Sequence, residues 1–307
     1  MIEIRPRQPG VPIPWLEASV QTLISNQDTG QRVALQQWSL AAGSRTTTRC
    51  HAFEREHVYV VNGECTFRVG ESTLSGRRGD LLVVPAGLPR QYENTGKEAA
   101  ELFVFWTPGH VQDAYQPSAD EARREALGVA LMETFEAGYR PTGWAASESA
   151  IFRPSGSCRG YSTAGDHYSI LVDGDDSRQG LALIEALVPP GGGPIPHIHL
   201  RDFEAFLVFE GQLSLYADGK LASAGPGDSV ILPTGLPHAF RNRTSEPVRM
   251  LIVTAPAGFD RMISLVGRLS DRPQPPDPSE LKRLKEVAGQ FGLVLRPDLE
   301  ERFTAPG

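Results

Sequence analysis

The sequence has few cysteines, no surplus of positive charge and no long apolar run. Three cysteines occur in 307 residues and form no CxxC pair, so they make a poor disulfide framework and suit a reducing compartment. Acidic residues outnumber basic residues by 37 to 30, which argues against a nucleic-acid partner, because no surplus cations are available to neutralise phosphates. The chain has no apolar stretch of about 18 residues, and no signal peptide near its start. These absences predict a soluble, cytoplasmic protein without a membrane partner.

Glycine and proline are abundant instead, and the chain repeats itself. With 31 glycines and 25 prolines, the composition favours many turns over long helices. The segment 79–89 reads GDLLVVPAGLP and the segment 227–237 reads GDSVILPTGLP, an offset of 148 positions. The same offset pairs Glu56 with Glu204. A length near that of two ordinary domains and an internal repeat indicate two copies of one fold.

Each copy has the pattern of an all-β domain. Apolar, β-prone runs at 58–61 and 206–209 are each followed by a glycine turn. Short strands separated by frequent turns are typical of a sandwich or barrel. Two other segments predict accessory helices. One begins with a capping box at 118–121 and continues at helical spacing through Phe135, and the other is capped by Ser279 and ends before Gly292.

The second copy carries a set of residues that can bind a metal. His197 and His199 are two positions apart, so on a strand both side chains point to the same face. Glu204 follows across a turn, and His238 comes just after the turn at 233–237. Three imidazoles and one carboxylate suit one divalent Fe, Mn, Co, Ni or Zn ion per chain and leave coordination positions open. Iron is the first candidate.

These residues resemble the two sequence motifs of the cupin family. The run from the glycines at 191–193 through Glu204 to Gly211 is similar to the first motif, G-x5-H-x-H-x3–4-E-x6-G, and 227–242 is similar to the second, G-x5-P-x-G-x2-H-x3-N. The resemblance implies a bicupin, that is, two tandem antiparallel β-barrels of the double-stranded β-helix or jelly-roll type with a few accessory helices. The expected parts are an N-terminal barrel over 1–115, a partly helical linker over 116–165, a C-terminal barrel over 166–260 and a helical tail over 261–307.

The first copy has lost part of the ligand set. The offset maps the four ligand positions onto Arg49, His51, Glu56 and Arg90. Because arginine keeps its proton and is not a usual metal ligand, we expect the first barrel to be free of metal. Two interpretations stay open: the arginines pair with Glu56 and replace the charge of a metal, or they form a pocket for an acidic ligand.

The layout and ligand set also resemble the quercetinase group of cupin dioxygenases. That resemblance implies a small aromatic or enol substrate, dioxygen as co-substrate, and Glu204 as the catalytic residue that accepts the substrate hydroxyl proton. Phe206 and Val208 share the strand parity of Glu204, and Phe240 shares that of His238. We therefore expect these three side chains to line an apolar substrate pocket.

Two other functions fit the same residues. A non-redox metal enzyme, such as an isomerase, cyclase or decarboxylase of an enol or polyketide, would use the metal as a Lewis acid without oxygen. A non-catalytic cupin would bind a small ligand, with Arg49 and Arg90 as its best support. Oxygen consumption separates the first from the dioxygenase, and turnover of any ligand separates both enzymes from the binding protein. A homodimer is compatible with all three.

Overall fold

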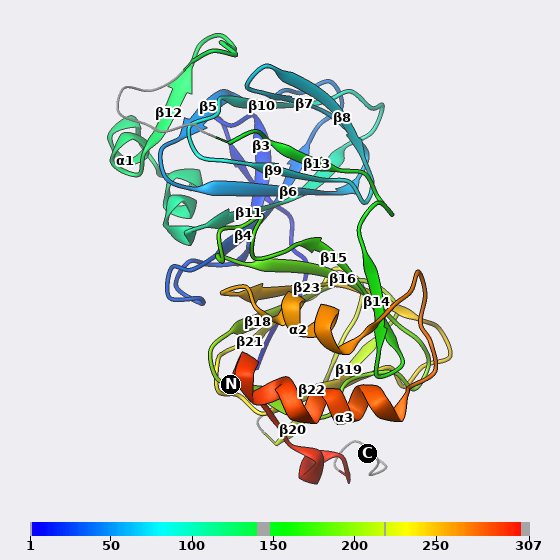
Figure 1. The fold of residues 1–307 in the computed structure, drawn as a ribbon. Helices are drawn as coiled ribbons and strands as arrows, with labels where there is room; N and C mark the ends of the chain where they lie inside the picture. The colour runs from blue at the N-terminus through cyan, green and yellow to red at the C-terminus, as the bar shows by residue number, and fades with distance from the viewer. Residues whose placement is uncertain (1, 140–147, 218, 302–307) are drawn as a thin grey trace. The chain divides into compact units, whose positions relative to one another are not determined.

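The computed structural model describes residues 2–139, 148–217 and 219–301, which fall into two compact units. One unit is Gln8–Ser157, and the other joins Met1–Arg7 to Cys158–Gly307. Both are built mainly from antiparallel strands, which can be followed in Figure 1. In the described part of the chain, no helix combines the length and apolarity that crossing a membrane requires.

The unit Gln8–Ser157 consists of two facing antiparallel sheets, in the orders β13-β9-β6-β11-β4-β3-β2 and β12-β5-β10-β7-β8. The strands of the first sheet are β2 (Val11–Ile13), β3 (Ala18–Ile24), β4 (Ala34–Leu40), β6 (Arg55–Asn62), β9 (Leu81–Val84), β11 (Ala100–Thr107) and β13 (Ile151–Arg153). Those of the second are β5 (Thr48–His51), β7 (Glu64–Val69), β8 (Ser72–Arg77), β10 (Arg90–Asn94) and β12 (Val129–Met132). Two short helices follow β11, η1 (Gly109–Tyr115) and α1 (Glu121–Ala126).

The other unit has the same plan, in the orders β1-β21-β18-β23-β16-β15-β14-β24 and β20-β19-β22-β17-β25. The strands of its first sheet are β1 (Glu3–Arg5), β14 (Gly160–Thr163), β15 (Asp166–Val172), β16 (Ala182–Val188), β18 (Phe203–Glu210), β21 (Ser229–Leu232), β23 (Val248–Ala255) and β24 (Arg268–Leu269). Those of the second are β17 (His197–His199), β19 (Leu213–Ala217), β20 (Lys220–Ala224), β22 (His238–Arg241) and β25 (Leu293–Leu295). Its helices are α2 (Phe259–Val266), α3 (Pro278–Val287), η2 (Ala288–Phe291) and η3 (Pro297–Leu299).

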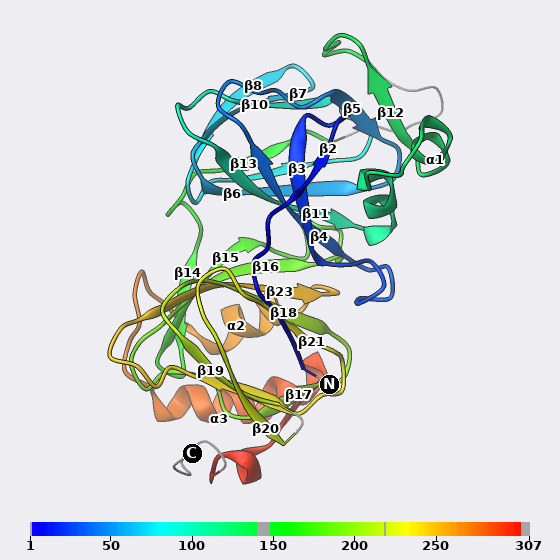
Figure 2. The ribbon, with the colours of Figure 1, turned by 180° about the vertical axis from the view of Figure 1, so that it is seen from behind.

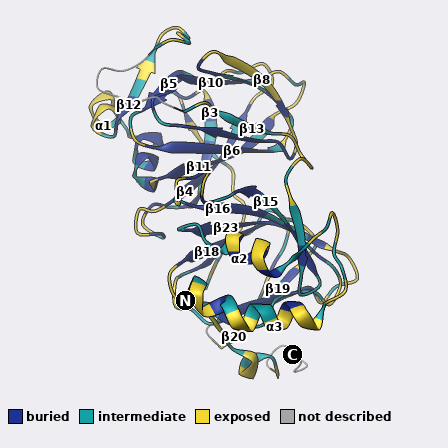
Figure 3. Ribbon diagram, viewed as in Figure 1, coloured by how far each residue is buried: buried dark blue, intermediate teal, exposed yellow. Residues whose placement is uncertain are grey.

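The internal repeat extends through whole strands. β3, β4 and β11 begin 148 positions before β15, β16 and β23. Since alternate residues of a strand point to opposite faces, each unit collects an apolar cluster between its two sheets, around Trp38 in one unit and Phe206 in the other. Figure 3 shows that the strands are largely buried while the outer side of α3 is exposed. The all-β, two-barrel fold expected from the sequence is confirmed.

Each copy of the repeat contributes its first strand to the edge of a sheet in the other unit, a feature that the repeat alone does not predict. β1 pairs with β21, with Glu3 opposite Ile231, and β13 pairs with β9, with Ile151 opposite Val83. Val83 and Ile231 are themselves 148 positions apart, so β1 and β13 occupy equivalent places. The start of the chain therefore lies on the edge of β21 (Figure 2), a pairing that the expected boundary of 1–115 did not include.

The helix expected from 118 through Phe135 is wrong in its extent. α1 ends at Ala126, and the chain then forms β12, which pairs with β5. Gly128, with a φ of 74°, allows the left-handed turn that ends the helix. The cap is also different, because the side chain of Asp120 accepts the backbone N–H of Arg123. Pairing with the sheet has outweighed the helical spacing of the apolar residues.

The second expected helix is confirmed, with one change at its start. α3 and η2 cover 278–291, and Gly292 ends them in the left-handed conformation. The N-cap is Asp277, whose carboxylate accepts the backbone N–H of Ser279. Pro278 follows it, at a position where a missing N–H costs nothing.

Candidate metal centre

Three strands of the second barrel bring the four expected ligand residues together. β17 carries His197 and His199 on one face, while Ile198 between them points away. Glu204 lies near the start of β18, and His238 begins β22 directly opposite His197. One nitrogen or oxygen atom from each of the four side chains lies within 4.8 Å of the others. Each of the four residues is at most 5% exposed.

Hydrogen bonds donated by Nδ1 fix the orientation of the three rings. His197 Nδ1 donates to the Ile195 carbonyl at 2.7 Å, and His238 Nδ1 donates to the Leu236 carbonyl at 2.8 Å. His199 Nδ1 lies 3.3 Å from the Asp202 carboxylate. Because a carbonyl oxygen only accepts, Nδ1 carries the proton and Nε2 offers its lone pair, which is the tautomer that a metal ligand needs.

The Nε2 atoms converge on the carboxylate of Glu204. His238 Nε2 is 2.8 Å from Glu204 Oε2, and His199 Nε2 is 3.7 Å from the same oxygen. The Nε2 atoms of His197 and His199 are buried and have no hydrogen-bond partner within the described ranges. Buried nitrogens of this kind are normally satisfied, so these residues fit a bound divalent transition metal.

Burial and the charges of neighbouring ligand residues keep His197 neutral and Glu204 ionised, the states in which these side chains bind a cation. Burial lowers the pKa of His197 to about 3, helped by the nearby His238 and His199, so its imidazole is neutral. Burial alone would raise the pKa of Glu204, but His199 and His238 outweigh it and lower the pKa to about 2. His199 differs: burial acts to lower its pKa, yet the charges of Glu204 and Asp202 leave it raised.

Metal binding should therefore release the proton of any protonated His199, because a ligating imidazole must be neutral. The raised pKa of His199 extends its protonated form to higher pH, so affinity should increase as pH rises through that pKa. Calorimetric titrations at pH 7 in two buffers of different ionisation enthalpy measure this proton release. An affinity that decreased between pH 6 and 8, or proton uptake on binding, would contradict the expectation.

The residues expected to line a substrate pocket lie inside the same barrel. Phe206, Val208 and Phe240 belong to its interior apolar cluster and are at most 3% exposed. The rings of Phe206 and Phe240 meet edge to face with centroids 5.4 Å apart. Their contact with a substrate stays a prediction.

Two residues beside the ligands were not identified from the sequence. Asp202 holds His199, and its position three residues after that histidine was the available signal. Phe259 packs its ring edge to face on His199 at 5.4 Å. Phe259 begins α2, after the last strand of the repeat, so strand parity could not have placed it.

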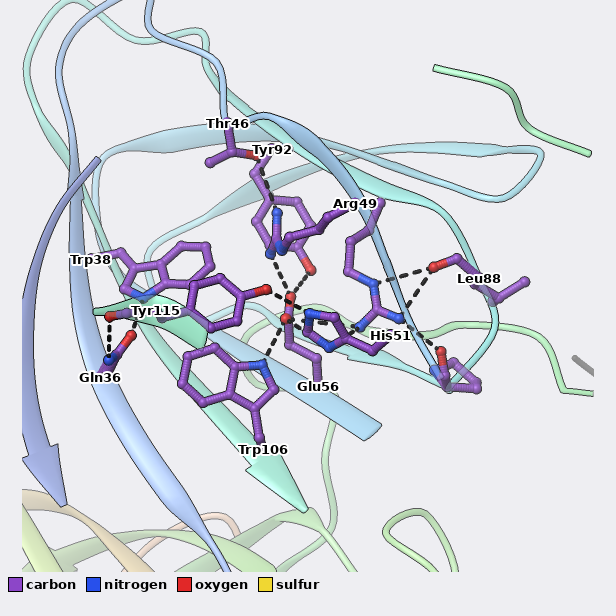
Figure 4. A network of polar contacts seen from close by, with 12 residues as sticks. Gln36, Trp38, Thr46, Arg49, His51, Glu56, Leu88, Tyr92, Trp106 and Tyr115 are labelled. Carbon is purple, nitrogen blue, oxygen red and sulfur yellow. Dashed lines mark hydrogen bonds and ion pairs between the residues drawn. The ribbon is translucent and has the colours of Figure 1, made fainter. Parts of the chain in front are cut away.

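The four equivalent residues of the first barrel form a closed charge cluster, with Glu56 at its centre (Figure 4). Arg49 donates to Glu56 Oε1 at 2.8 Å, and Arg90 Nη1 lies 3.8 Å from Oε2. All of these side chains are fully buried. Burial alone would raise the pKa of Glu56, but Arg49 and Arg90 outweigh it, so the pKa is lowered. The expected pairing of Glu56 with the arginines is confirmed.

Aromatic side chains complete this cluster. Tyr92 donates its hydroxyl hydrogen to Glu56 Oε1 at 2.5 Å, and Trp106 Nε1 donates to Oε2 at 2.8 Å. The Tyr115 hydroxyl lies 2.5 Å from Nε2 of His51. Burial, together with Arg90 and Arg49, lowers the pKa of His51 well below its usual value, so the ring is neutral. The carboxylate that would face a metal is already occupied on both oxygens.

The guanidinium groups have partners within the barrel, which bears on the anion-pocket interpretation. Arg49 donates to Glu56 and Thr46, and lies over the ring of Tyr92 at 4.7 Å. Arg90 donates to the carbonyls of Leu88 and Pro85. Because these groups are buried and engaged, the geometry favours arginine as a replacement for metal charge.

Comparison with known proteins agrees with this geometry. Residues 36–106 and 184–254 each match the model of the cupin domain. The chain is 23% identical to quercetin 2,3-dioxygenase of Bacillus subtilis (strain 168) over 281 residues, which is 81% of either chain. A solved structure of oxalate decarboxylase from Bacillus subtilis at pH 4.6 superposes with a TM-score of 0.58 at 14% identity, over 83% of this chain and 76% of that one.

Proposed function

We propose, from the premise that this chain is a cupin protein with two cupin domains, that it is a metal-dependent dioxygenase acting on an enolisable, planar aromatic substrate. The observation that carries the proposal is the buried three-histidine, one-glutamate cluster of the second domain. Similarity to quercetin 2,3-dioxygenase over 81% of both chains supports ring opening of a flavonol-like compound as the first reaction to test.

Each residue of the site has a role in this proposal. His197, His199, Glu204 and His238 would hold the metal. A bound divalent transition metal would acidify a coordinated hydroxyl and supply the redox chemistry that oxygen addition needs. Iron remains the first candidate.

Glu204 is the proposed acceptor of the substrate hydroxyl proton. It is the only carboxylate of the ligand set, and its pKa of about 2 means that it is ionised at neutral pH. His199 and His238, whose Nε2 atom lies 2.8 Å from Glu204, lower this pKa, and a bound dication would act in the same direction. Glu204 would therefore accept the proton of a hydroxyl that the same metal has made more acidic. Phe206 and Phe240 would provide apolar walls that exclude water from the reacting ring.

The binding-module alternative loses its main support from the first barrel. That alternative depended on Arg49 and Arg90 as receptors for an acidic ligand, and both guanidinium groups are buried and engaged inside the protein. The non-redox alternative uses the same residues as the dioxygenase and is separated from it by oxygen uptake.

Replacing Glu204 with Gln should lower kcat by about 100-fold or more, because proton transfer by a positioned group contributes roughly that much. KM should change less, since the proton is moved only along the reaction. The measurement is oxygen uptake with quercetin and related enols, using metal-reconstituted protein of measured metal content. Glu210→Gln is the matched control, because Glu210 ends the same strand and its side chain is 54% exposed. Anaerobic conversion of an enol without oxygen uptake would move the assignment to a non-redox enzyme.

A further inference from the structure

The hydroxyl of Thr254 is a buried polar group that the proposed reaction has not yet used. Thr254 lies on β23 directly opposite Glu204 on β18, so the two side chains project from the same face of the sheet. Its exposed fraction is 0%, and Oγ1 has no hydrogen-bond partner among the residues that the structure describes. A buried hydroxyl without a partner is costly, which points to a ligand at this position.

The first barrel shows what the same position does when no ligand is needed. Trp106 lies opposite Glu56, as Thr254 lies opposite Glu204. Trp106 Nε1 donates to Glu56 at 2.8 Å, so its indole satisfies and covers the carboxylate. In the second barrel the hydroxyl of Thr254 makes no such bond to Glu204. The repeat therefore provides an internal comparison between a buried carboxylate with a donor from this strand position and one without it.

Two more aromatic rings beside Trp106 are absent at the equivalent positions. Trp38 and Tyr115 both pack on Trp106, with centroids 5.9 Å and 4.8 Å away. The offset of 148 replaces Trp38 with Ala186 and Tyr115 with Ile263. The three packed rings on the Trp106 side of Glu56 have thus become small or aliphatic beside Glu204, whereas Tyr92, which also donates to Glu56, is replaced by the aromatic Phe240.

The second barrel has not simply lost aromatic rings, because others appear elsewhere in it. Phe206 stands where the first barrel has Val58, and Tyr168 stands where it has Val20. Both rings are buried in the interior cluster. The second barrel therefore keeps aromatic side chains in its interior, at positions other than those of Trp38 and Trp106.

We infer that Thr254 is a substrate-binding residue, whose hydroxyl donates a hydrogen bond to a carbonyl or enolate oxygen of a planar ligand beside Glu204. Thr254 and Ala186 stand where the first barrel has Trp106 and Trp38, so the ring of that ligand would lie where those two indoles lie in the first barrel. The ligand class is a neutral or singly charged planar compound with adjacent ring oxygens. This inference rests on the proposed function for the identity of the ligand, but it concerns binding and is tested without turnover.

The test measures binding to the full-length, metal-reconstituted protein without oxygen. The probes are quercetin and the single-ring 3-hydroxy-4-pyranone, followed by their absorption changes. Thr254→Val removes the hydroxyl at nearly constant shape and should weaken both probes by about threefold to tenfold, the effect of one hydrogen bond. Thr254→Ser keeps the hydroxyl and should bind within about twofold of the parent protein.

A third variant tests the size of the site. Thr254→Trp copies the first barrel and should weaken quercetin by at least about 100-fold, because the indole occupies the place of the ring. Metal content should stay near one ion per chain in Thr254→Val and Thr254→Ser, which separates loss of ligand binding from loss of the metal. Metal content is also measured in Thr254→Trp, because an indole that donates to Glu204 as Trp106 does to Glu56 would compete with the metal. If Thr254→Trp does not fold, the near-isosteric Val and Ser variants still decide the question.

The outcomes distinguish this inference from the proposed reaction. Binding of quercetin that depends on the Thr254 hydroxyl, without oxygen uptake, would sustain the inference and remove the dioxygenase assignment. Equal affinities of the parent protein and Thr254→Val for both probes would overturn the inference while leaving the reaction in place. Failure of the parent protein to bind either probe would overturn both.

Discussion

The double variant His197→Ala/His199→Ala should hold less than about 0.1 equivalents of metal, where the parent protein holds about one. The substitution removes two of four ligands, both from β17, and these two nitrogens have no other hydrogen-bond partner in the residues described. Glu204 and His238 remain, with His238 Nε2 2.8 Å from Glu204 Oε2. Two ligands alone bind a divalent ion weakly. Elemental analysis of well-washed protein purified without a His-tag measures the result.

A control separates loss of the site from loss of histidine in general. His110 lies on η1 in the first unit and its side chain is 33% exposed, so His110→Ala should leave the metal content unchanged. Near two equivalents of metal in the parent protein would contradict the single-site assignment, because the first barrel would then hold an ion as well. Retention of metal by the double variant would show that the ligands lie elsewhere.

The sequence predicted the metal cluster because its residues follow local rules. Two histidines at i and i+2 on a strand share a face, and the register of β17 with β22 then brings His238 opposite His197. The turn residues at 233–237 place His238 at the start of the next strand, and the constant offset finds the same turn in the first copy. The same offset identified Glu56 as the equivalent carboxylate of the first copy, for which the arginines provide the balancing positive charge.

Contacts between segments far apart in the chain could not be predicted in this way. β1 joins β21, and β12 joins β5, through backbone hydrogen bonds that need no particular side-chain pattern. The apolar spacing that suggested a long helix through Phe135 instead serves a strand, since an open sheet edge was available. Phe259 lies at the metal site because a helix follows β23 there, and no local period in the sequence reports that position.

Replacing Arg49 with Met should destabilise the first barrel by about 3–5 kcal/mol, because it leaves a buried carboxylate with too little positive charge. Arg49 and Glu56 are both fully buried and lie 2.8 Å apart. Arg90 is 3.8 Å from the other carboxylate oxygen and donates to backbone carbonyls, so it replaces only part of the loss. Urea unfolding followed by tryptophan fluorescence is a suitable measurement, since Trp38 and Trp106 lie in this cluster.

The pH dependence of this loss has a defined direction. The pKa of Glu56 is lowered in the folded protein from an ordinary value of 4.5. Its contribution to the free energy of unfolding is therefore fully present above that value and is lost as pH falls through the lowered pKa. The difference between the parent protein and Arg49→Met should be constant near neutral pH and should shrink in acid.

The double variant Arg49→Met/Glu56→Gln tests whether the pair itself is responsible. If the damage comes from an uncompensated charge, removing that charge should recover part of the loss, and the two single effects should exceed the double effect by about 1–3 kcal/mol. The exposed pair Lys282 and Glu286, 80% and 57% exposed on α3, is the matched control. Its removal should change stability by no more than about 0.5 kcal/mol, because exposed helix pairs contribute little. Additive effects at Arg49 and Glu56, each below about 1 kcal/mol, would mean that aromatic packing, and not charge, has taken the place of the metal.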